Sequence, residues 1–289
     1  MQEERKGEIY MLLLSVLESW FPILSLFSIA LVGAMYSFAF SVSVATVIFL
    51  SLVIYQKKLP QLFQKDARKD LLLTTFFINL LFLLVFLGLQ YTTAGNMAVI
   101  VFLQLLFAYL YFNVFGSDKL SKAHTVGAII MGIGALTILI PDDLSFNKGD
   151  LIILLAAALA PFANLYQKRA RTYVSSETIL AFRNIVALPI LFMIAYLAEP
   201  LPSVENLMKA APYVLGIGVL ILGLSKILWI EALHRISITK ISAMLAVVPL
   251  FTLIIAYFIL NETPDLRQIL GIAPILIGGY LITKPETDV

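Results

Sequence analysis

The stretch Ile9–Tyr55, IYMLLLSVLESWFPILSLFSIALVGAMYSFAFSVSVATVIFLSLVIY, has Glu18 as its only charged residue. A single helix of that length would measure about 70 Å, more than twice the roughly 30 Å of a bilayer core. The chain must therefore cross the membrane twice within this stretch, and Gly33 is the residue at which we expect it to turn. The pattern predicts two membrane spans, at about 9–30 and 34–55.

The whole chain has the same apolar character. Of its 289 residues, 61% are hydrophobic and 13% are charged, whereas soluble domains are about 45–50% apolar and about 25% charged. A water-exposed surface could not accommodate this excess. The apolar runs are too long and too uniform for barrel strands, so the sequence predicts an all-α integral membrane protein. Cysteine is absent, which excludes disulfides and thiolate chemistry.

Eight further apolar runs predict ten transmembrane helices in total. They lie at about 71–90, 96–116, 124–141, 150–168, 177–198, 212–233, 239–260 and 266–283. The segment before residue 9 is short and mixed in charge, and the run after it is too long for a signal peptide. We therefore expect the first span to be retained. The absence of a targeting segment favours a prokaryotic inner membrane.

The lysines and arginines predict the orientation of these spans. With the N-terminus inside, fifteen of the 20 basic residues fall in inside segments and three fall in outside loops, with two more inside spans. The inside set is Arg5, Lys6, Lys57, Lys58, Lys65, Arg68, Lys69, Lys119, Lys122, Lys168, Arg169, Arg171, Arg235, Lys240 and Lys284, and the outside set is Lys148, Lys209 and Arg267. Both termini are therefore predicted to be cytoplasmic.

The two halves of the chain resemble each other weakly. A shift of 144 residues aligns Leu89–Pro141 with Leu233–Pro285 without a gap, matching Leu106-Phe107 with Leu250-Phe251 and Gly134 with Gly278. Because each half contains an odd number of spans, a repeat would have inverted topology. We predict a five-helix repeat at 1–141, a linker at 142–149 and a second, inverted five-helix repeat at 150–289.

This plan resembles the drug/metabolite transporter superfamily, in particular its EamA-type members. The motifs that carry the resemblance are Ile241–Phe251 with Pro249, the acidic turn Leu260-Asn261-Glu262-Thr263-Pro264, and the glycines Gly271, Gly278 and Gly279. The first half matches less well, since Gln104-Leu105 stands where the second half has Val248-Pro249, and Ser117-Asp118-Lys119 replaces the acidic turn. The resemblance implies a transporter with a cavity between its halves.

Two charged residues within the spans are the main candidates for a substrate site. A charge in the bilayer is costly and usually faces a cavity or a partner. Glu18 lies near the middle of the first span beside Trp20 and Pro22, where it could carry a proton, bind a substrate cation or bond to a neighbouring helix. Lys226 lies within the eighth span, three residues before Trp229. It could bind an anion, pair with Glu18 across the halves, or extend its stem toward the inner surface.

Other residues within the spans have weaker claims. Arg183 is interpreted as extending toward the cytoplasmic surface or bonding to a loop carbonyl, and Glu231 as an ordinary helix-surface ion pair with Arg235. Asn79, Gln104 and Asn164 each fit either a substrate site or a bond between helices. Close helix packing is the favoured role of the glycines in spans five and ten: Gly127, Gly132, Gly134, Gly271, Gly278 and Gly279.

The sequence thus predicts a secondary transporter for a small organic solute. The transporter is expected to work by alternating access, and protons could drive it. The predicted substrate-binding residues are Glu18, Trp20, Asn79, Gln104, Asn164, Lys226 and Trp229. Glu18 and Lys226 together could hold the ammonium and carboxylate of an amino acid or related metabolite. Export of larger amphiphilic compounds through an aromatic cavity is an alternative, and a non-transporting sensor, scramblase or partner subunit is another.

No catalytic motif, phosphate-binding loop or metal-ligand spacing occurs in the sequence. We therefore expect no enzymatic activity, no cofactor and no bound metal. The expected partners are the lipid bilayer and a small-molecule solute, and no nucleic acid. A monomer and a homodimer both fit the sequence.

Overall fold

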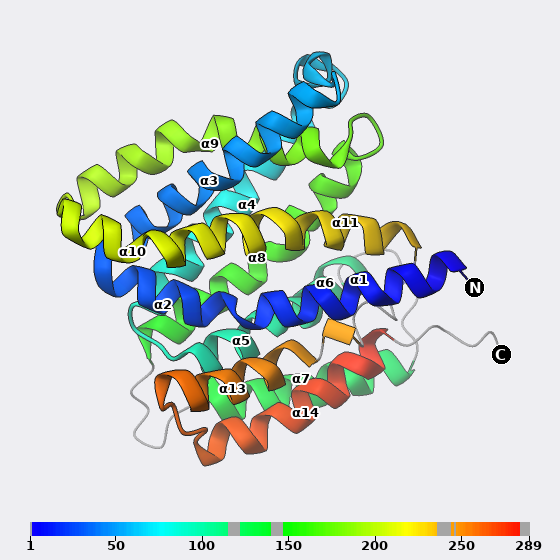
Figure 1. Cartoon of the computed structure of the whole chain (residues 1–289). Coiled ribbons are helices and arrows are strands. Elements are labelled where there is room, and N and C mark those ends of the chain that lie inside the picture. The colour runs from blue at the N-terminus through cyan, green and yellow to red at the C-terminus, as the bar shows by residue number, and fades with distance from the viewer. Residues whose placement is uncertain (1, 115–121, 140–146, 236–243, 246, 284–289) are drawn as a thin grey trace.

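The computed structural model describes residues 2–114, 122–139, 147–235, 244–245 and 247–283, and the elements named in these ranges are all helices (Figure 1). In chain order they are α1 (Gln2–Ser19), α2 (Phe21–Val32), α3 (Ala34–Tyr55), η1 (Leu59–Phe63), α4 (Arg68–Leu89), α5 (Ala94–Phe102), α6 (Gln104–Tyr109), η2 (Leu110–Val114), α7 (Lys122–Leu139), α8 (Lys148–Ala170), α9 (Ser176–Ala198), α10 (Val204–Gly216), η3 (Ile217–Ser225), α11 (Lys226–Arg235), α13 (Val247–Leu260) and α14 (Leu266–Thr283). The segments η2 and η3 are π-helical.

Seven helical stretches are long and apolar enough to cross a membrane. They are Arg5–Val32, Ala34–Tyr55, Arg68–Leu89, Ala94–Phe112, Lys148–Ala170, Ser176–Ala198 and Val204–Ala232, and three shorter apolar helices lie at Ala123–Thr137, Val247–Leu260 and Leu266–Leu281. The predicted all-helical, multi-span membrane architecture is confirmed. The count of ten stays a prediction, because the described parts of these three helices are shorter than the other seven stretches.

The first long apolar stretch turns at Gly33, as its length predicts. Gly33 has φ 83°, a backbone conformation that residues with a Cβ rarely adopt, and it separates α2 from α3. The first span is itself interrupted at Trp20, and α2 begins there with Pro22 in its first turn. A proline is tolerated at this position because the first helical N–H groups have no partner within the helix. The interruption lies two residues after Glu18.

Two predicted boundaries need comment. The helix of the eighth span begins at Val204 rather than near residue 212, because Ser203 caps it by accepting a hydrogen bond from the Asn206 N–H. The added residues are mixed in polarity, so hydropathy did not mark them as part of a span. Helix α8 begins at Lys148, inside the predicted linker 142–149, with Asn147 as its cap. Residues 142–146 of the linker, and 239–243 of the predicted ninth span, lie outside the described residues.

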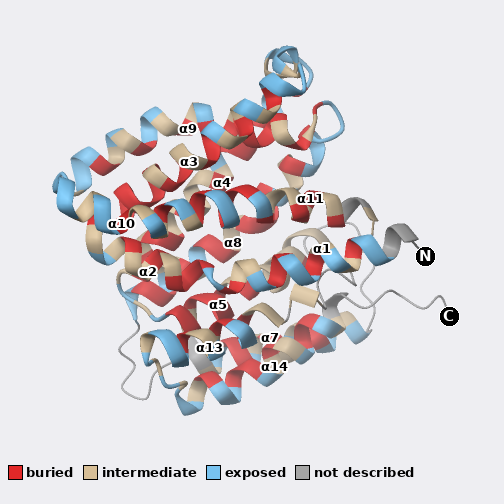
Figure 2. Cartoon of the chain, viewed as in Figure 1, coloured by how far each residue is buried: buried red, intermediate tan, exposed pale blue. Residues whose placement is uncertain are grey.

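The core lies between the helices, while large apolar side chains cover the outside. Figure 2 shows buried residues along the inward faces and exposed residues along the outward faces of the bundle. Phe21, Phe38, Phe82 and Phe86 pack together from α2, α3 and α4, with ring centroids 5.1–6.0 Å apart. Outward residues such as Leu197 and Phe258 are 75% and 73% exposed. An outer surface of this kind requires lipid around it.

Glycines let α7 and α14 pack closely along their length (Figure 1). A Cβ added at Gly134 would lie 2.7 Å from the Gly271 carbonyl oxygen, and one at Gly278 would lie 2.5 Å from that of Gly127. The predicted packing role of Gly134 and Gly278 is therefore confirmed. Gly132 differs, because an added Cβ would meet no atom within 4 Å. The packing interpretation of Gly132 is wrong.

This difference supplies a matched pair of variants. Replacing Gly278 with Ala forces backbone atoms apart, and we expect it to lower the free energy of unfolding by about 1–3 kcal/mol relative to Gly132→Ala. Both variants gain about the same helix propensity, so that contribution cancels. Thermal unfolding of the two purified variants in the same detergent measures the difference. Equal stability would contradict the close approach of α7 and α14.

Candidate functional site

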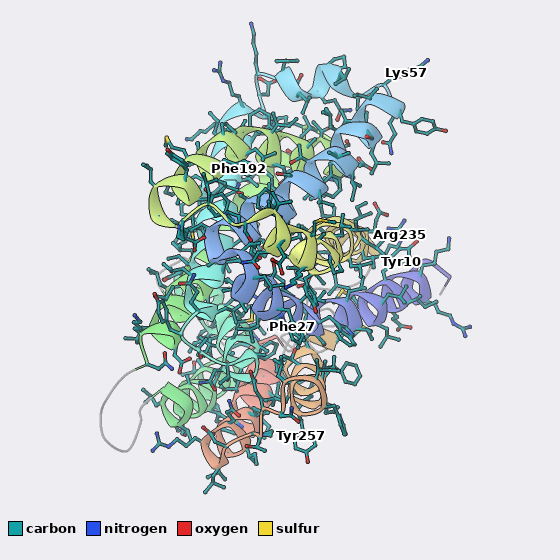
Figure 3. All side chains as sticks on the ribbon, turned by 60° about the vertical axis from the view of Figure 1, so that its left-hand side comes forward. Tyr10, Phe27, Lys57, Phe192, Arg235 and Tyr257 are labelled. Atoms are coloured by element: carbon teal, nitrogen blue, oxygen red, sulfur yellow. The ribbon has the colours of Figure 1, made fainter. Side chains whose placement is uncertain are left out.

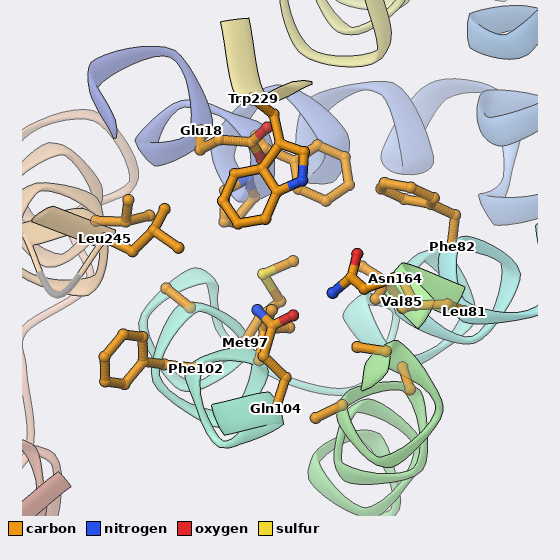
Figure 4. A pocket seen from close by; sticks show the side chains of 18 of the residues that line it. Glu18, Leu81, Phe82, Val85, Met97, Phe102, Gln104, Asn164, Trp229 and Leu245 are labelled. Atoms are coloured by element: carbon orange, nitrogen blue, oxygen red, sulfur yellow. The ribbon is translucent and has the colours of Figure 1, made fainter. Parts of the chain in front are cut away.

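A cavity of about 190 Å³ lies inside the bundle. Its wall is mostly apolar, and its charged members are Glu18, Arg183 and Lys226. The lining residues come from helices on both sides of the predicted linker, from α1 and α2 through α4–α6 to α8, α9, α11 and α13. Figure 4 shows Glu18 and Trp229 on one side of this space and Gln104 and Asn164 extending into it from the other. A site in this position is typical of membrane transporters.

Glu18 and Lys226 form an ion pair at the cavity wall. The Lys226 Nζ donates to Glu18 Oε1 at 2.6 Å, and the Ser225 hydroxyl donates to the same carboxylate oxygen. The two charged side chains are 20% and 19% exposed. The Lys226 ammonium also lies 5.5 Å from the centre of the Phe82 ring, within the range of a cation–π contact. The predicted pairing of Glu18 with Lys226 is therefore present in the structure.

Local irregularities in both helices position this pair. Glu18 stands in the last turn of α1, directly before the interruption at Trp20. Lys226 follows η3, whose π-helical hydrogen bonding widens the middle of its span. Such π-helical segments occur frequently at functional sites, because the altered winding redirects the side chains that follow. Ser225 and Lys226, at the end of this segment, are the residues that contact Glu18.

Two of the predicted amides face the cavity without partners. Gln104 and Asn164 line it, together with Gln167, and none of these three side chains makes a hydrogen bond to another described residue. They do not join helices here, which leaves their donors and acceptors available to a solute. Trp229 also lines the cavity, with its indole between the ion pair and the amides (Figure 4).

The other two predicted site residues lie elsewhere. Trp20 is 38% exposed and is not part of the cavity wall. The Asn79 amide donates to the Thr75 carbonyl at 2.8 Å and to the Arg183 carbonyl at 3.5 Å, and it is likewise outside the wall. The structure thus gives Asn79 the alternative role, a bond from α4 to α9.

Arg183 is a cavity residue that the sequence interpretation missed. Its side chain was expected to extend to the cytoplasmic surface or to bond to a loop carbonyl, but the residue is only 3% exposed and lines the cavity. Its position seven residues past the start of α9 is compatible both with a side chain that extends to the cytoplasmic surface and with one that faces the cavity. The position in the sequence therefore did not decide between these two orientations. The interpretation of Glu231 is confirmed, since its carboxylate accepts from the Arg235 guanidinium four residues later. Arg235 also lies over the Tyr10 ring at 5.4 Å (Figure 3).

A second polar cluster closes the end of the bundle where α2, α4, α9 and α13 finish. The Glu199 carboxylate accepts from the N–H groups of Ala34, Met35 and Tyr36 at 2.9–3.3 Å and from the Gln90 amide at 3.2 Å. Glu262 accepts from the N–H groups that begin α5, at 3.3 and 3.4 Å. A carboxylate at a helix N-terminus satisfies free N–H groups and the helix dipole. We call Glu199, Glu262 and the helix starts that they cap the polar end cluster.

Comparison with known proteins identifies this class of membrane protein. The model of the EamA-like transporter family matches residues 5–140 and again residues 147–284. The chain therefore belongs to the EamA-like transporter family, as the resemblance predicted.

Individual relatives agree with this assignment. An uncharacterized transporter of Bacillus subtilis (strain 168), YoaV, is 25% identical over 244 residues, which cover 83% of each chain. An uncharacterized transporter of Archaeoglobus fulgidus is 28% identical over 220 residues, 72% of this chain and 73% of that one. A solved structure of 16% sequence identity shares the fold, with a TM-score of 0.66 over 95% of both chains.

The ion pair can be tested by a double-mutant cycle. Removing one partner leaves the other charge uncompensated in a partly buried site, so we expect Glu18→Gln and Lys226→Met each to destabilise the protein, and the double variant to recover part of the loss. The coupling should be about 1–3 kcal/mol, measured by unfolding in detergent. The exposed pair Glu205–Lys209, 75% and 59% exposed, is the control and should show almost no coupling. An equally small coupling for Glu18 and Lys226 would contradict the pairing.

Proposed function

We propose that the protein is a secondary transporter that moves a small organic solute, such as an amino acid or related metabolite, through the central cavity by alternating access. The observation that carries the proposal is the ion pair in the cavity wall, which joins α1 to the start of α11. These helices belong to opposite predicted repeats. A change in the relative position of the repeats would therefore act directly on the charged groups that face the solute.

The packing of the helices supports two inverted repeats at 1–141 and 150–289. In an inverted repeat, α8 is the counterpart of α1 and α2. The counterpart of α4 is the span formed by α10, η3 and α11. Helix α4 packs on α8, and correspondingly α10 packs on α2 and α11 packs on α1. The two separate matches of the family model fall on the same halves. We further propose an inner-membrane location with both termini cytoplasmic, on the basis of the lysine and arginine distribution.

The polar end cluster is the proposed gate on the extracytoplasmic side. Glu199 and Glu262 reach helix starts far from them in sequence through hydrogen bonds, and such bonds can be exchanged for water when this end opens. The helices themselves would stay intact, because only their free terminal N–H groups are involved.

Glu18 is the proposed site of coupling to protons. Its carboxylate is held by Lys226 and Ser225 within the membrane region. Protonation of Glu18 would release the Lys226 ammonium, so the charge of the cavity would change with one proton. This provides a route by which a pH gradient could drive accumulation of a solute.

Uptake into reconstituted vesicles tests the proposal. Vesicles containing the native protein should accumulate one class of solute from a mixed amino-acid and metabolite pool, read by mass spectrometry, and a pH gradient should increase the accumulation. Glu18→Gln should abolish the effect of the gradient, while Glu205→Gln should leave it unchanged. Unchanged uptake and pH dependence in Glu18→Gln would exclude the proton role. Accumulation of many unrelated lipophilic compounds would instead favour the exporter of larger amphiphiles, and lipid movement alone would favour a scramblase.

The proposed gate makes a separate prediction, helped by the absence of native cysteine. Ala34 is fully buried and its N–H donates to Glu199. In an Ala34→Cys background, Glu199→Gln should increase the rate of labelling by a membrane-impermeant maleimide by about two- to fivefold, because it weakens the helix cap. A cysteine at Lys209 should label equally with or without Glu199→Gln. An unchanged rate at residue 34 would argue against the gate.

A further inference from the structure

Among the described residues, the guanidinium group of Arg183 has no counter-charge in the cavity. It stands on α9 with 3% of its surface exposed, and it forms part of the cavity wall. Its side chain makes one hydrogen bond to the described part of the chain, from Nε to the Asn184 Oδ1 at 3.3 Å. No described carboxylate pairs with it. The remaining guanidinium donors are therefore free to bind a solute.

The other charges in the wall cannot supply the missing partner. Glu18 is engaged by Lys226 and by the Ser225 hydroxyl, so this pair is close to neutral. The formal charge of the described lining residues is then that of Arg183 alone, plus one. An isolated charge in a low-dielectric interior is unfavourable until a counter-ion arrives. The cavity is consequently suited to a singly charged anion.

From this arrangement we propose that Arg183 binds the carboxylate of the transported solute, and that the solutes are organic carboxylates with an apolar body. The planar guanidinium matches a carboxylate with two parallel hydrogen bonds. The proposal rests on the transport function proposed above and names the substrate class of that same site.

The rest of the wall fits the apolar body of such a solute. Ile78, Leu81, Phe82 and Val85 of α4 line the cavity, as do Ala156, Ala157 and Ala160 of α8. A cavity of about 150 Å³ accommodates benzene in another protein, and this one measures about 190 Å³. Because the Glu18 carboxylate is already occupied, an amino group on the solute is not required for binding. A monocarboxylate is therefore preferred over an obligatory zwitterion.

Binding to the purified protein tests this with three matched probes: phenylacetate, its neutral analogue phenylacetamide, and 2-phenylethylamine. We expect phenylacetate to bind native protein at least about tenfold more tightly than the other two, the effect of a charge-assisted, bidentate hydrogen bond. In Arg183→Gln the preference should fall to about one. Arg183→Lys should keep part of it, since a lysine retains the charge without the planar geometry. The exposed Arg169 lies over the Tyr166 ring, and Arg169→Gln is the control that should keep the full preference.

Several results would overturn the proposal. Equal binding of phenylacetate and phenylacetamide to native protein would do so without any variant, so the test does not depend on how Arg183→Gln folds. Undiminished preference in a folded Arg183→Gln, or much tighter binding of L-phenylalanine than of phenylacetate, would also overturn it. Vesicle uptake separates this proposal from the transport function. Uptake of a neutral or cationic solute that Arg183→Gln leaves unchanged would retain transport and reject the Arg183 site. Selective phenylacetate binding without uptake of any solute would retain the Arg183 site and reject transport.

Discussion

Charge in the interior of a membrane protein must be compensated where it lies, because neither lipid nor a packed apolar core can solvate it. The pair formed by Glu18 and Lys226 meets this requirement across the middle of the bundle. Both helices depart from regular geometry next to the pair, α1 at its interruption and the eighth span at η3. Both irregularities lie next to residues of the cavity wall, Pro22 after the first and Lys226 after the second.

A second requirement, the satisfaction of backbone N–H groups at helix starts, organises the ends of the bundle. Ser175, Ser203 and Asn147 cap their own helices locally. The polar end cluster differs, because Glu199 and Glu262 cap helices that begin more than 160 residues earlier in the chain. Long-range caps of this kind hold separate helices together through a few hydrogen bonds. They close one end of the bundle with contacts that are simple to exchange for water.

In the part of the chain that the structure describes, the cavity wall is apolar and contains an almost neutral ion pair, amides without partners and one uncompensated arginine. Membership of the EamA-like transporter family supports a transporter role and does not identify the substrate. The substrate class must therefore be inferred from the chemistry of this wall. The chemistry of the wall makes the ion pair suited to coupling transport to protons, and it makes Arg183 suited to binding the solute. A solute that brings its own negative charge would complete the electrostatics of the cavity, which is a direct physical reason for selectivity.

The sequence by itself determined the membrane location, most span positions, the turn at Gly33 and the close packing of Gly134 and Gly278. These features follow from bilayer thickness, backbone freedom and side-chain size, all of which can be read along the chain. It also identified Glu18 and Lys226 as candidate cavity residues and left pairing between them as one of several alternatives, which the structure decided. Only the tertiary structure decided that Arg183 faces the cavity, that Trp20 lies outside it and that Asn79 bonds to α9. The reason is that the rotation of each helix about its axis is set by packing against its neighbours, and a residue's depth in the membrane does not fix the direction of its side chain.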